Sequence, residues 1–423
     1  MPHDADHAAT APLAPAPALA ASSGRLGFIL VCVFIDMLGI GLIIPVLPML
    51  IGEFTEGREY QAQWYGAMVT LFGLMQFICM PILGAMSDRL GRRPVLLFSI
   101  IGVGTNFLIT ALAPSLWFMA LGRIIGGMSS ASISVASAYA ADVSAPENRA
   151  KSFGMVGAAF GLGFICGPML GGLLGGVSLR LPFYVGSALC AANAIYGYLM
   201  VPESLPRDRR TPFSIRRANP FAALSRLAAR RDIRGLVAVF ALVTFGQIML
   251  QTTWVLYTYF RFGWGTRDNG IALFCVGLSA AVVQAGLLGW LVKRLGEVRL
   301  SLLGLTSGAI VYVLYGLATE GWMMYVFILC NLLAFAVGPA LQGIVSKLTD
   351  PREQGALMGS LQSLGSLAMV IVPEVGALIL ARVSKLPAHD WRIGATFFLS
   401  ATLQTVALII AWRYFAKRRV PAA

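Results

Sequence analysis

The sequence predicts an all-α integral membrane protein with twelve transmembrane helices. Three observations lead to this prediction: 57% of the 423 residues are hydrophobic, only 12% are charged, and long apolar runs recur along most of the chain. Soluble domains carry about 25% charged residues. A soluble globule of this size would still expose roughly a quarter of its unfolded surface, and this chain has too few polar groups to cover that surface. Lipid is therefore the expected solvent.

Twelve apolar runs are long enough to cross a bilayer. Each holds about 20 residues or more, and a rise of 1.5 Å per residue carries such a helix through a hydrocarbon core of about 30 Å. In chain order, the predicted spans are residues 27–50, 65–85, 95–113, 116–140, 153–176, 182–201, 236–260, 270–292, 299–318, 321–346, 357–381 and 392–412.

The segments outside the spans complete the predicted organisation. Residues 1–24 are rich in Ala and Pro and lack the hydrophobic stretch of a signal peptide, which predicts a disordered cytoplasmic tail. A Pro- and Arg-rich cytoplasmic loop, residues 202–235, separates two six-helix bundles. The first bundle comprises residues 25–201, and the second, with a short basic tail, comprises residues 236–423.

The two bundles are related in sequence. GAMSDRLG from Gly84 recurs in weakened form as GWLVKRLG from Gly289, an offset of 205 residues, and the same offset joins Gly171 to Gly376. One constant offset across three spans predicts an internal duplication, and hence two pseudo-symmetric halves. Parallel repeats of six spans are typical of transporters whose site lies between the halves.

The positive charges predict the orientation in the membrane. Of the 32 Lys and Arg residues, 24 lie on one side of the predicted spans and seven on the other, and nine of the 24 lie in the loop 202–235. Cytoplasmic connections carry this excess, so both termini are predicted to lie in the cytoplasm, with the spans in the inner (plasma) membrane. The net charge of +13 is thus a topology signal, and we expect no nucleic-acid partner.

Residues for catalytic and metal sites are scarce. The three histidines lie in a tail or a loop, the six cysteines lie in apolar runs without a CxxC pair, and no GxxxxGK[ST] loop occurs. These patterns argue against a catalytic His cluster, disulfides, a zinc site and ATP hydrolysis. We therefore expect a protein that is not an enzyme and holds no metal or cofactor of its own.

The motif GAMSDRLGRRP lies in the short link between the second and third predicted spans. We expect Gly84 to permit close contact between helices, Asp88 to pair with an arginine or a helix N-terminus, and Arg92 to mark the cytoplasmic side. A simple positive anchor is the alternative interpretation. The spacing of the motif and its partial repeat in the second half favour a role in conformational change.

The fifth span, GAAFGLGFICGPMLGG from Gly157, is rich in small residues. Gly163, Gly167 and Gly171 are spaced for a smooth helix face, and Pro168 is expected to bend the helix. Small residues four positions apart allow helices to approach closely. Plain helix packing explains the glycines alone, whereas the GPxxGG ending favours a conformational role.

Three charged side chains lie well inside predicted spans: Asp36, Arg123 and Glu374. Each costs about 2.5–3.5 kcal/mol at the bilayer centre on insertion scales, so an unpaired structural role is not expected. Asp36 lies among Gly and Pro residues that loosen its helix, where a carboxylate can exchange a proton. A structural ion pair is the alternative for Asp36, and Arg123 is expected to face a carboxylate or an anion.

Uncharged polar residues on other spans are the remaining candidates for a substrate site. Gln247 and Gln251 lie one turn apart and close to Trp254, which makes one helix face both polar and aromatic. Each such residue alone could simply bridge two helices, where a hydrogen bond contributes about 0.6 kcal/mol. Together they predict a mixed aromatic and hydrogen-bonding cavity, formed by Gln76, Asn106, Gln247, Gln251, Trp254 and Gln284.

Four motifs together resemble the major facilitator superfamily: GAMSDRLGRRPVLL, LGRIIGG, GLGFICGPMLGG and DMLGIGLIIPVLP. Within it, the chain is similar to the twelve-helix drug/proton antiporters and most of all to the tetracycline efflux proteins. The resemblance is strong over residues 25–200 and weaker over 235–415. It implies the major facilitator fold and export of a drug driven by proton entry, and tetracyclines travel as a divalent-cation chelate. The GPxxGG motif resembles the one associated with antiport.

The resemblance also assigns residues and shows departures. The chain lacks the acid that tetracycline exporters carry in the third span, where Asn106 stands, and it lacks a His near Ala280 and an acid around Gly308. The likeness therefore supports proton-coupled drug export better than tetracycline itself, and one hypothesis is that Glu374 took over a lost acidic role. The positions that match those important for transport are Asp36, Gln76, Asp88, Arg92, Arg123, Asp142 and Arg149.

The leading interpretation is a monomeric proton-driven drug exporter in which two halves rock around a midplane cavity. Asp88, Arg92, Asp142 and Arg149 are expected to form a cytoplasmic charge cluster that holds the outward-open state. Three alternatives remain: a broader multidrug or metabolite exporter of the same family, a proton-coupled importer, and a membrane receptor that transports nothing.

Overall fold

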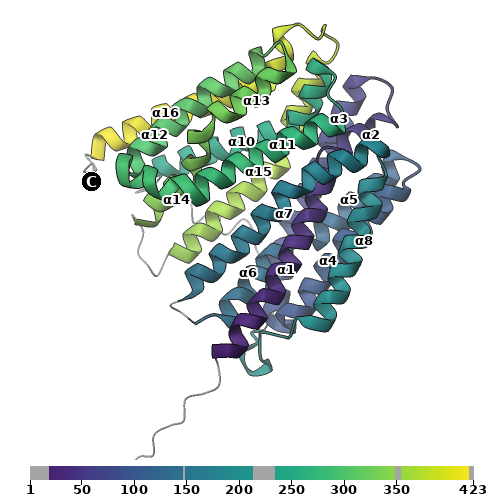
Figure 1. Cartoon of the computed structure of the whole chain (residues 1–423), viewed down its shortest axis with the longest axis vertical. Helices are drawn as coiled ribbons and strands as arrows, with labels where there is room; N and C mark the ends of the chain where they lie inside the picture. Colours follow the sequence, from purple (N-terminus) through teal and green to yellow (C-terminus); the bar gives the residue numbers. More distant parts are fainter. Residues whose placement is uncertain (1–18, 146–147, 213–233, 348–353, 419–423) are drawn as a thin grey trace, which may run out of the picture.

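The computed structural model describes residues 19–145, 148–212, 234–347 and 354–418, and the regular elements within these ranges are helices (Figure 1). The predicted tail and loop fall largely outside the described residues. In the first half the helices are α1 (Leu19–Ile43), α2 (Leu47–Gly52), α3 (Arg58–Leu90), α4 (Arg92–Leu112), α5 (Leu116–Ser129), α6 (Ser132–Val143), α7 (Arg149–Val177) and α8 (Leu181–Met200). Helix α1 thus begins a few residues inside the predicted tail.

The second half follows the short helix η2 (Arg207–Arg209). Its elements are α10 (Arg234–Phe262), α11 (Thr266–Ala281), the π-helical turn η3 (Val282–Leu287), α12 (Leu288–Leu317), α13 (Gly321–Cys330), η4 (Leu332–Ala336), α14 (Val337–Lys347), α15 (Gln354–Val383), η5 (Trp391–Gly394) and α16 (Ala395–Arg418).

Within the described residues, ten helices are long and apolar enough to cross a membrane, and counting the pair α13 and α14, bent by 49°, as one span gives eleven. One of the ten, Thr266–Leu317, holds 52 residues and covers two predicted spans. Its chain turns at Gly296, where φ is 72° and ψ is 157°. Only glycine adopts such angles readily. Dividing Thr266–Leu317 into two spans at this turn, together with the bent pair α13 and α14 as one span, gives the twelve predicted spans.

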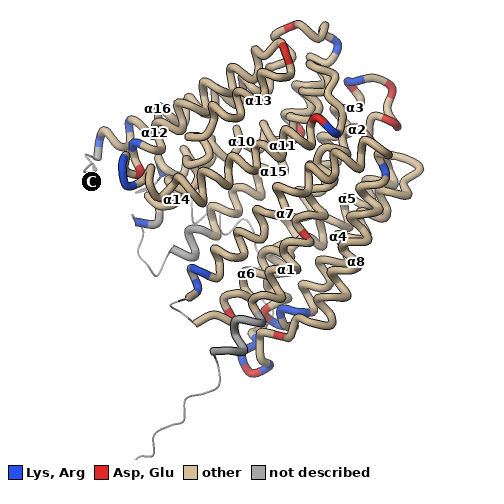
Figure 2. Tube along the Cα trace, in the orientation of Figure 1, with Lys and Arg blue, Asp and Glu red and all other residues tan. Residues whose placement is uncertain are grey.

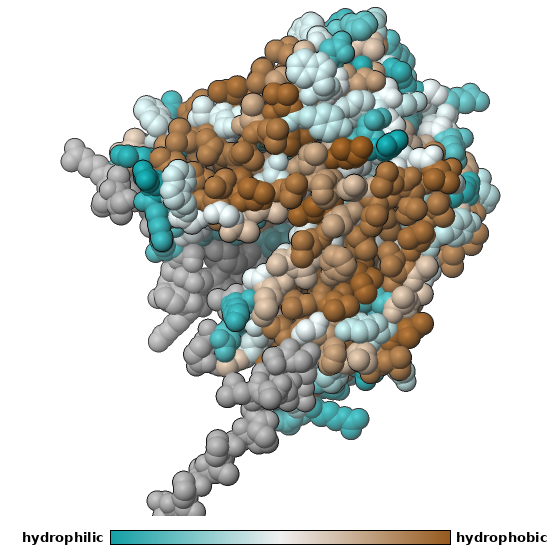
Figure 3. All heavy atoms as spheres, viewed as in Figure 1, coloured by the Kyte–Doolittle hydropathy of each residue, from teal (hydrophilic) through white to brown (hydrophobic). Residues whose placement is uncertain are grey.

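The surface matches a protein that lies in lipid. Figure 3 shows hydrophobic residues over most of the visible face and hydrophilic residues mainly at its ends. Figure 2 shows Lys, Arg, Asp and Glu gathered at the ends of the helices. Apolar side chains such as Trp117 and Val177 are 75% and 80% exposed. Exposed apolar surface is unfavourable in water, whereas contact with lipid removes this free-energy cost.

Each half packs mainly within itself. In the first half α1 lies against α7 and α8, and α4 lies against α5 and α8; in the second half α10 and α12 both lie against α16. The halves meet where α7 packs on α11 and α3 packs on α15. The division into bundles at residues 25–201 and 236–423 agrees with this packing but stays a prediction.

Glycine contacts show where the two halves approach closely. Near the end that carries Lys385, a Cβ atom on Gly172 would lie 2.5 Å from the Thr266 carbonyl oxygen, and near the middle of α3 one on Gly73 would lie 2.6 Å from the Met369 oxygen. Toward the opposite end, which carries Arg92, the same helices have open space around their glycines. A Cβ atom would meet nothing within 4 Å at Gly84, Gly154, Gly157, Gly161, Gly359 and Gly365.

An ion pair joins the halves at the Lys385 end. The Lys385 ammonium lies 2.6 Å from the Glu59 carboxylate at the start of α3, and this hydrogen bond raises the pKa of Lys385 above its ordinary value. Beside it, the Arg58 guanidinium lies 5.4 Å from the centre of the Phe260 ring at the end of α10. These contacts, with the glycine contacts, define a conformation that is closed at the Lys385 end.

Candidate functional site

A buried carboxylate lies in the middle of the first half. Asp36, on α1, has only 1% of its surface exposed, and no cation pairs with it among the described residues. Its Oδ2 accepts a hydrogen bond of 2.5 Å from the Ser132 hydroxyl on α6, and its Oδ1 has no partner. Without a cation the ion-pair alternative lacks a partner here, so the carboxylate is placed to bind a proton.

The fourth span is interrupted next to Asp36. Helix α5 ends at Ser129 and α6 begins at Ser132, and Ala131 between them has φ −133° and ψ 4°, outside the helical region. The Gln76 amide on α3 donates a 2.9 Å hydrogen bond to the Ser130 hydroxyl in the break. The break is thus tied to α1 through Ser132 and to α3 through Gln76. Hydropathy did not reveal it, because the serines that form it sit in an apolar run.

The second intramembrane charge, Arg123 on α5, is 5% exposed. Its guanidinium lies 5.7 Å from the centre of the Phe72 ring, and its Nε and one terminal nitrogen have no hydrogen-bond acceptor. A buried guanidinium without an acceptor leaves strong donors unsatisfied. The expected carboxylate partner is absent among the described residues, so an anionic group would be bound favourably at this point.

The third intramembrane charge, Glu374 on α15, lies at the contact between the halves. It is half-buried, and a Cβ atom on Gly66 of α3 would lie 3.5 Å from its carboxylate oxygen. It forms no ion pair with the described residues. Its position at the interface is compatible with the acidic role suggested from the sequence, which stays a hypothesis.

The uncharged polar candidates differ in burial. Asn106 is buried against α5, where a Cβ atom on Gly126 would lie 2.8 Å from its Cγ. Trp254 is buried inside the second half, 5.4 Å from the ring of Tyr315. Three of the candidates are exposed: Gln247, Gln251 and Gln284. The mixed aromatic and polar cavity stays a prediction.

The glycines of α7 face two different helices. Gly163, Gly167 and Gly171 pack on the backbone of α1, where a Cβ atom on Gly167 would lie 2.6 Å from the Gly41 Cα. Gly172, one position further on, packs instead on α11. Pro168 contributes to both contacts, because its ring lies near Gly41 and its carbonyl oxygen lies near Gly270 of α11. The face formed by Gly163, Gly167 and Gly171 therefore lies on α1 within the first half, and the neighbouring Gly172 contacts the other half.

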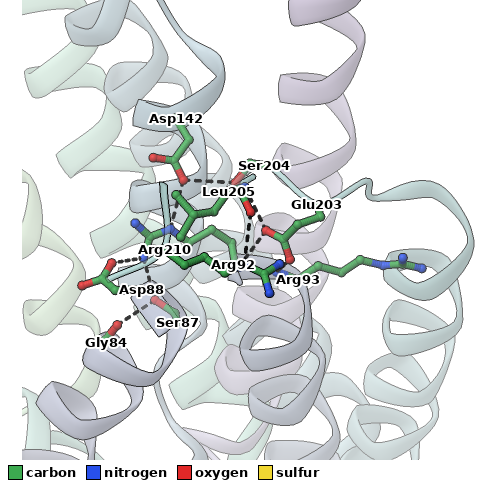
Figure 4. A network of polar contacts seen from close by, with 10 residues as sticks. All are labelled: Gly84, Ser87, Asp88, Arg92, Arg93, Asp142, Glu203, Ser204, Leu205 and Arg210. Carbon is green, nitrogen blue, oxygen red and sulfur yellow. Dashed lines mark hydrogen bonds and ion pairs between the residues drawn. The ribbon is translucent and has the colours of Figure 1, made fainter. Parts of the chain in front are cut away.

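A charge cluster surrounds Arg92 at the start of α4 (Figure 4). The guanidinium donates to the Asp88 carboxylate at 2.5 Å, to the Ser87 hydroxyl at 2.7 Å and to the Asp142 carboxylate at 3.0 Å. These partners come from the end of α3 and the end of α6. Asp88 keeps 48% of its side chain exposed, so it can accept a further partner.

Glu203 is a member of this cluster that the sequence analysis missed. Its carboxylate accepts hydrogen bonds from the backbone N–H groups of Arg92 at 2.8 Å and Arg93 at 3.3 Å, the first two of α4. The turn before them is formed by Gly91, at φ 112°. A carboxylate at a helix N-terminus satisfies free donors and the helix dipole. In the sequence, the one sign of this role is that Glu203 is an acidic residue in the arginine-rich segment after α8.

One predicted member of the cluster, Arg149, stands apart from it. Arg149 begins α7, is exposed and forms no ion pair with the described residues. The carbonyl oxygen of Gly84, which was predicted to permit close helix contact, accepts a 2.8 Å hydrogen bond from the Ser87 hydroxyl, but Gly84 makes no close helix contact in this conformation. The pairs of Arg92 are intact while the Lys385 end is closed, and all of them lie within the first half. In this conformation they therefore do not join the two halves.

The described residues contain no group of three or more His, Cys, Asp or Glu side chains arranged to hold a metal ion. The charged groups inside the spans, Asp36, Arg123 and Glu374, come from three different helices, α1, α5 and α15, and form no ion pair with one another.

Comparisons with known proteins agree with this arrangement. Residues 29–373 match the sequence model of the Major Facilitator Superfamily. The chain is 38% identical to the tetracycline resistance protein, class C, of Escherichia coli, over 89% of this chain and 95% of that protein. It is 37% identical to the class G protein of Vibrio anguillarum, over 88% of this chain and 94% of that protein.

A solved structure is similar as well. The human organic anion transporter MFSD10 superposes with a TM-score of 0.67 at 26% identity, covering 92% of this chain and 99% of that one. The sequence match spans more than half of the chain, and the described elements are helices long and apolar enough to cross a membrane. This chain therefore belongs to the Major Facilitator Superfamily.

Proposed function

We propose that this protein exports a tetracycline-like drug from the cytoplasm in exchange for protons, by alternating access. The observation that carries the proposal is Asp36, a fully buried carboxylate that pairs with no cation among the described residues, in a chain whose relatives are named for tetracycline resistance. A proton that enters down 100 mV supplies about 2.3 kcal/mol, before any pH gradient is counted.

The excess of positive charge at the Arg92 end supports its assignment to the cytoplasm. With that orientation, the contacts at the Lys385 end make this conformation inward-facing. Drug would enter from the cytoplasm, and the contacts of Glu59 with Lys385 and of Gly172 with α11 would break for release. The protein is proposed to act as a monomer, with both termini in the cytoplasm.

A broader multidrug or organic-anion exporter is the second candidate. It is favoured by Arg123, a buried guanidinium without an acceptor that suits an anionic substrate, and by Asn106 at a position where the tetracycline exporters resembled by this chain carry an acid. A divalent cation would travel with the substrate only in the tetracycline case, as part of a chelate.

A drug-susceptibility panel in an efflux-deficient bacterial host distinguishes these functions. Resistance limited to tetracyclines and abolished by a protonophore is the expected result. Resistance to chemically unrelated drugs would support the multidrug function instead. Uptake of drug into inverted vesicles under an imposed pH gradient tests the direction, because an importer would not load such vesicles with drug in exchange for internal protons.

The Arg92 cluster leads to a separate prediction. Asp88→Asn is expected to abolish resistance while the protein remains folded in the membrane. The amide keeps the shape of the side chain but loses the charge that pairs with Arg92 at 2.5 Å and that can accept a partner from the other half. Resistance and membrane abundance are measured together. Arg89→Gln is the control, because Arg89 is an exposed neighbour that forms no ion pair with the described residues. Normal resistance with Asp88→Asn would refute the role.

A further inference from the structure

The break between α5 and α6 places a helix start beside the buried carboxylate. Ala131 is the N-cap residue of α6, and its side chain makes no capping hydrogen bond. The first N–H groups of α6 therefore lack a partner within the helix. Ser132 is the first residue of this helix, and its hydroxyl contacts Asp36, 96 positions away. The helix dipole and the hydroxyl therefore act on the same side chain, and both favour its ionised form.

The hydrogen bond changes character when Asp36 takes up a proton. An ionised carboxylate only accepts, so the Ser132 hydroxyl must donate. A protonated carboxyl group can donate its own proton from Oδ2 to the Ser132 oxygen, and the serine proton is then free to turn elsewhere. A hydrogen bond between neutral groups is roughly half as strong as one to a charged group. The link between α1 and α6 thus depends on whether Asp36 carries a proton.

We propose that Ser132 is a positioning residue for proton coupling: it holds ionised Asp36 at the break in the fourth span and loosens its hold on α1 when Asp36 is protonated. This inference rests on the proposed function, because it takes Asp36 as the proton carrier. The break lets α6 respond separately from α5, since no continuous helical hydrogen bonding crosses Ser130 and Ala131.

The packing of α1 shows where such loosening would act. Helix α1 contacts α6, α7 and α8, and its Gly41 lies against Gly167 of α7, the helix that also contacts α11 of the other half. The other titratable groups near Asp36 are Cys32 on α1 and Cys190 on α8. Neither is charged at neutral pH, so Ser132 is the polar group in direct contact with the carboxylate.

The test compares hydroxyl variants in reconstituted vesicles, with the pH dependence of drug/proton exchange as the readout. Ser132→Ala is expected to move the pH of half-maximal transport upward by about one unit, since a hydrogen bond to a charged group is worth roughly that much. Ser132→Thr, which keeps the hydroxyl, is expected to retain the wild-type midpoint. Ser129→Ala is the matched control, because the Ser129 hydroxyl donates a 2.9 Å hydrogen bond to the Ile125 carbonyl of its own helix and bonds no other side chain among the described residues.

Ser132→Cys is a second variant, of similar volume but with a weak hydrogen-bond donor. It replaces Ser132→Ala if that variant lowers abundance, and we expect from it the same upward shift in the pH of half-maximal transport. If the pH of half-maximal transport is unchanged in Ser132→Ala or in Ser132→Cys while transport is still driven by the gradient, the role of Ser132 is overturned. Loss of gradient dependence in the wild-type protein would instead refute the proposed function. The two failures are therefore distinguishable.

Discussion

Asp36→Asn is expected to eliminate transport driven by a pH gradient. Asparagine has nearly the same shape, and its amide oxygen can still accept the hydrogen bond from Ser132, so the first half should fold normally. The amide cannot take up or release a proton, and among the described residues no other carboxylate contacts it. Gradient-driven uptake of drug into inverted vesicles should fall to the level of vesicles without the protein.

The same variant should keep one partial activity. Exchange of labelled for unlabelled drug at equal pH on both sides requires binding and conformational change but no net proton movement, so it should persist. Asp208→Asn serves as the control, because Asp208 lies exposed in η2 and forms no ion pair with the described residues. If Asp36→Asn still accumulates drug against a gradient, another group carries the proton, and Glu374 becomes the first alternative.

Gly172→Val is expected to abolish transport by preventing closure at the Lys385 end. A Cβ atom at this position would lie 2.5 Å from the Thr266 carbonyl oxygen and 2.9 Å from the Gly270 Cα. Both are backbone atoms of α11, so no side-chain movement relieves the overlap. Overpacking costs about 1–3 kcal/mol, which moves a two-state equilibrium by roughly 5- to 150-fold.

The protein should nevertheless insert and fold, because Gly163, Gly167 and Gly171, which pack α7 on α1, are unchanged. Closure can be measured with Glu59→Cys and Lys385→Cys in a background without the six native cysteines, since the wild-type side chains meet at 2.6 Å. Cross-linking of this pair should drop in Gly172→Val. Gly176→Val is the control, because a Cβ atom there would meet nothing within 4 Å; equal cross-linking in both variants would contradict the proposed closure.

The membrane spans could be predicted because hydropathy is a local property. Every predicted range overlaps helices of the described residues for most of its length, since a backbone in lipid must satisfy its hydrogen bonds internally. The interruptions were missed for the same reason. The break at Ser130 and the bend between α13 and α14 lie within apolar runs, where a window of 20 residues averages over a few non-helical angles.

The candidate site was predicted only in part. Asp36, Arg92 and Asp142 were selected from charge and motif, and the structure brings Arg92 and Asp142 to 3.0 Å. Ser132 and Glu203 were missed because a serine in an apolar span and an acid in a basic loop carry no distinctive pattern. Their importance comes from contacts with residues 96 and 111 positions away.

The amino-acid sequence by itself determined the lipid solvent, the all-helical class and the few charged side chains that lie inside apolar spans. Only the tertiary structure decided which polar groups meet, that Arg123 has no carboxylate partner among the described residues, and which end of the molecule is closed. Hydropathy and charge act on each segment separately, whereas these contacts depend on how closely whole helices approach. That approach is set by small residues on facing helices, such as Gly172 and Gly270, whose pairing no local pattern specifies.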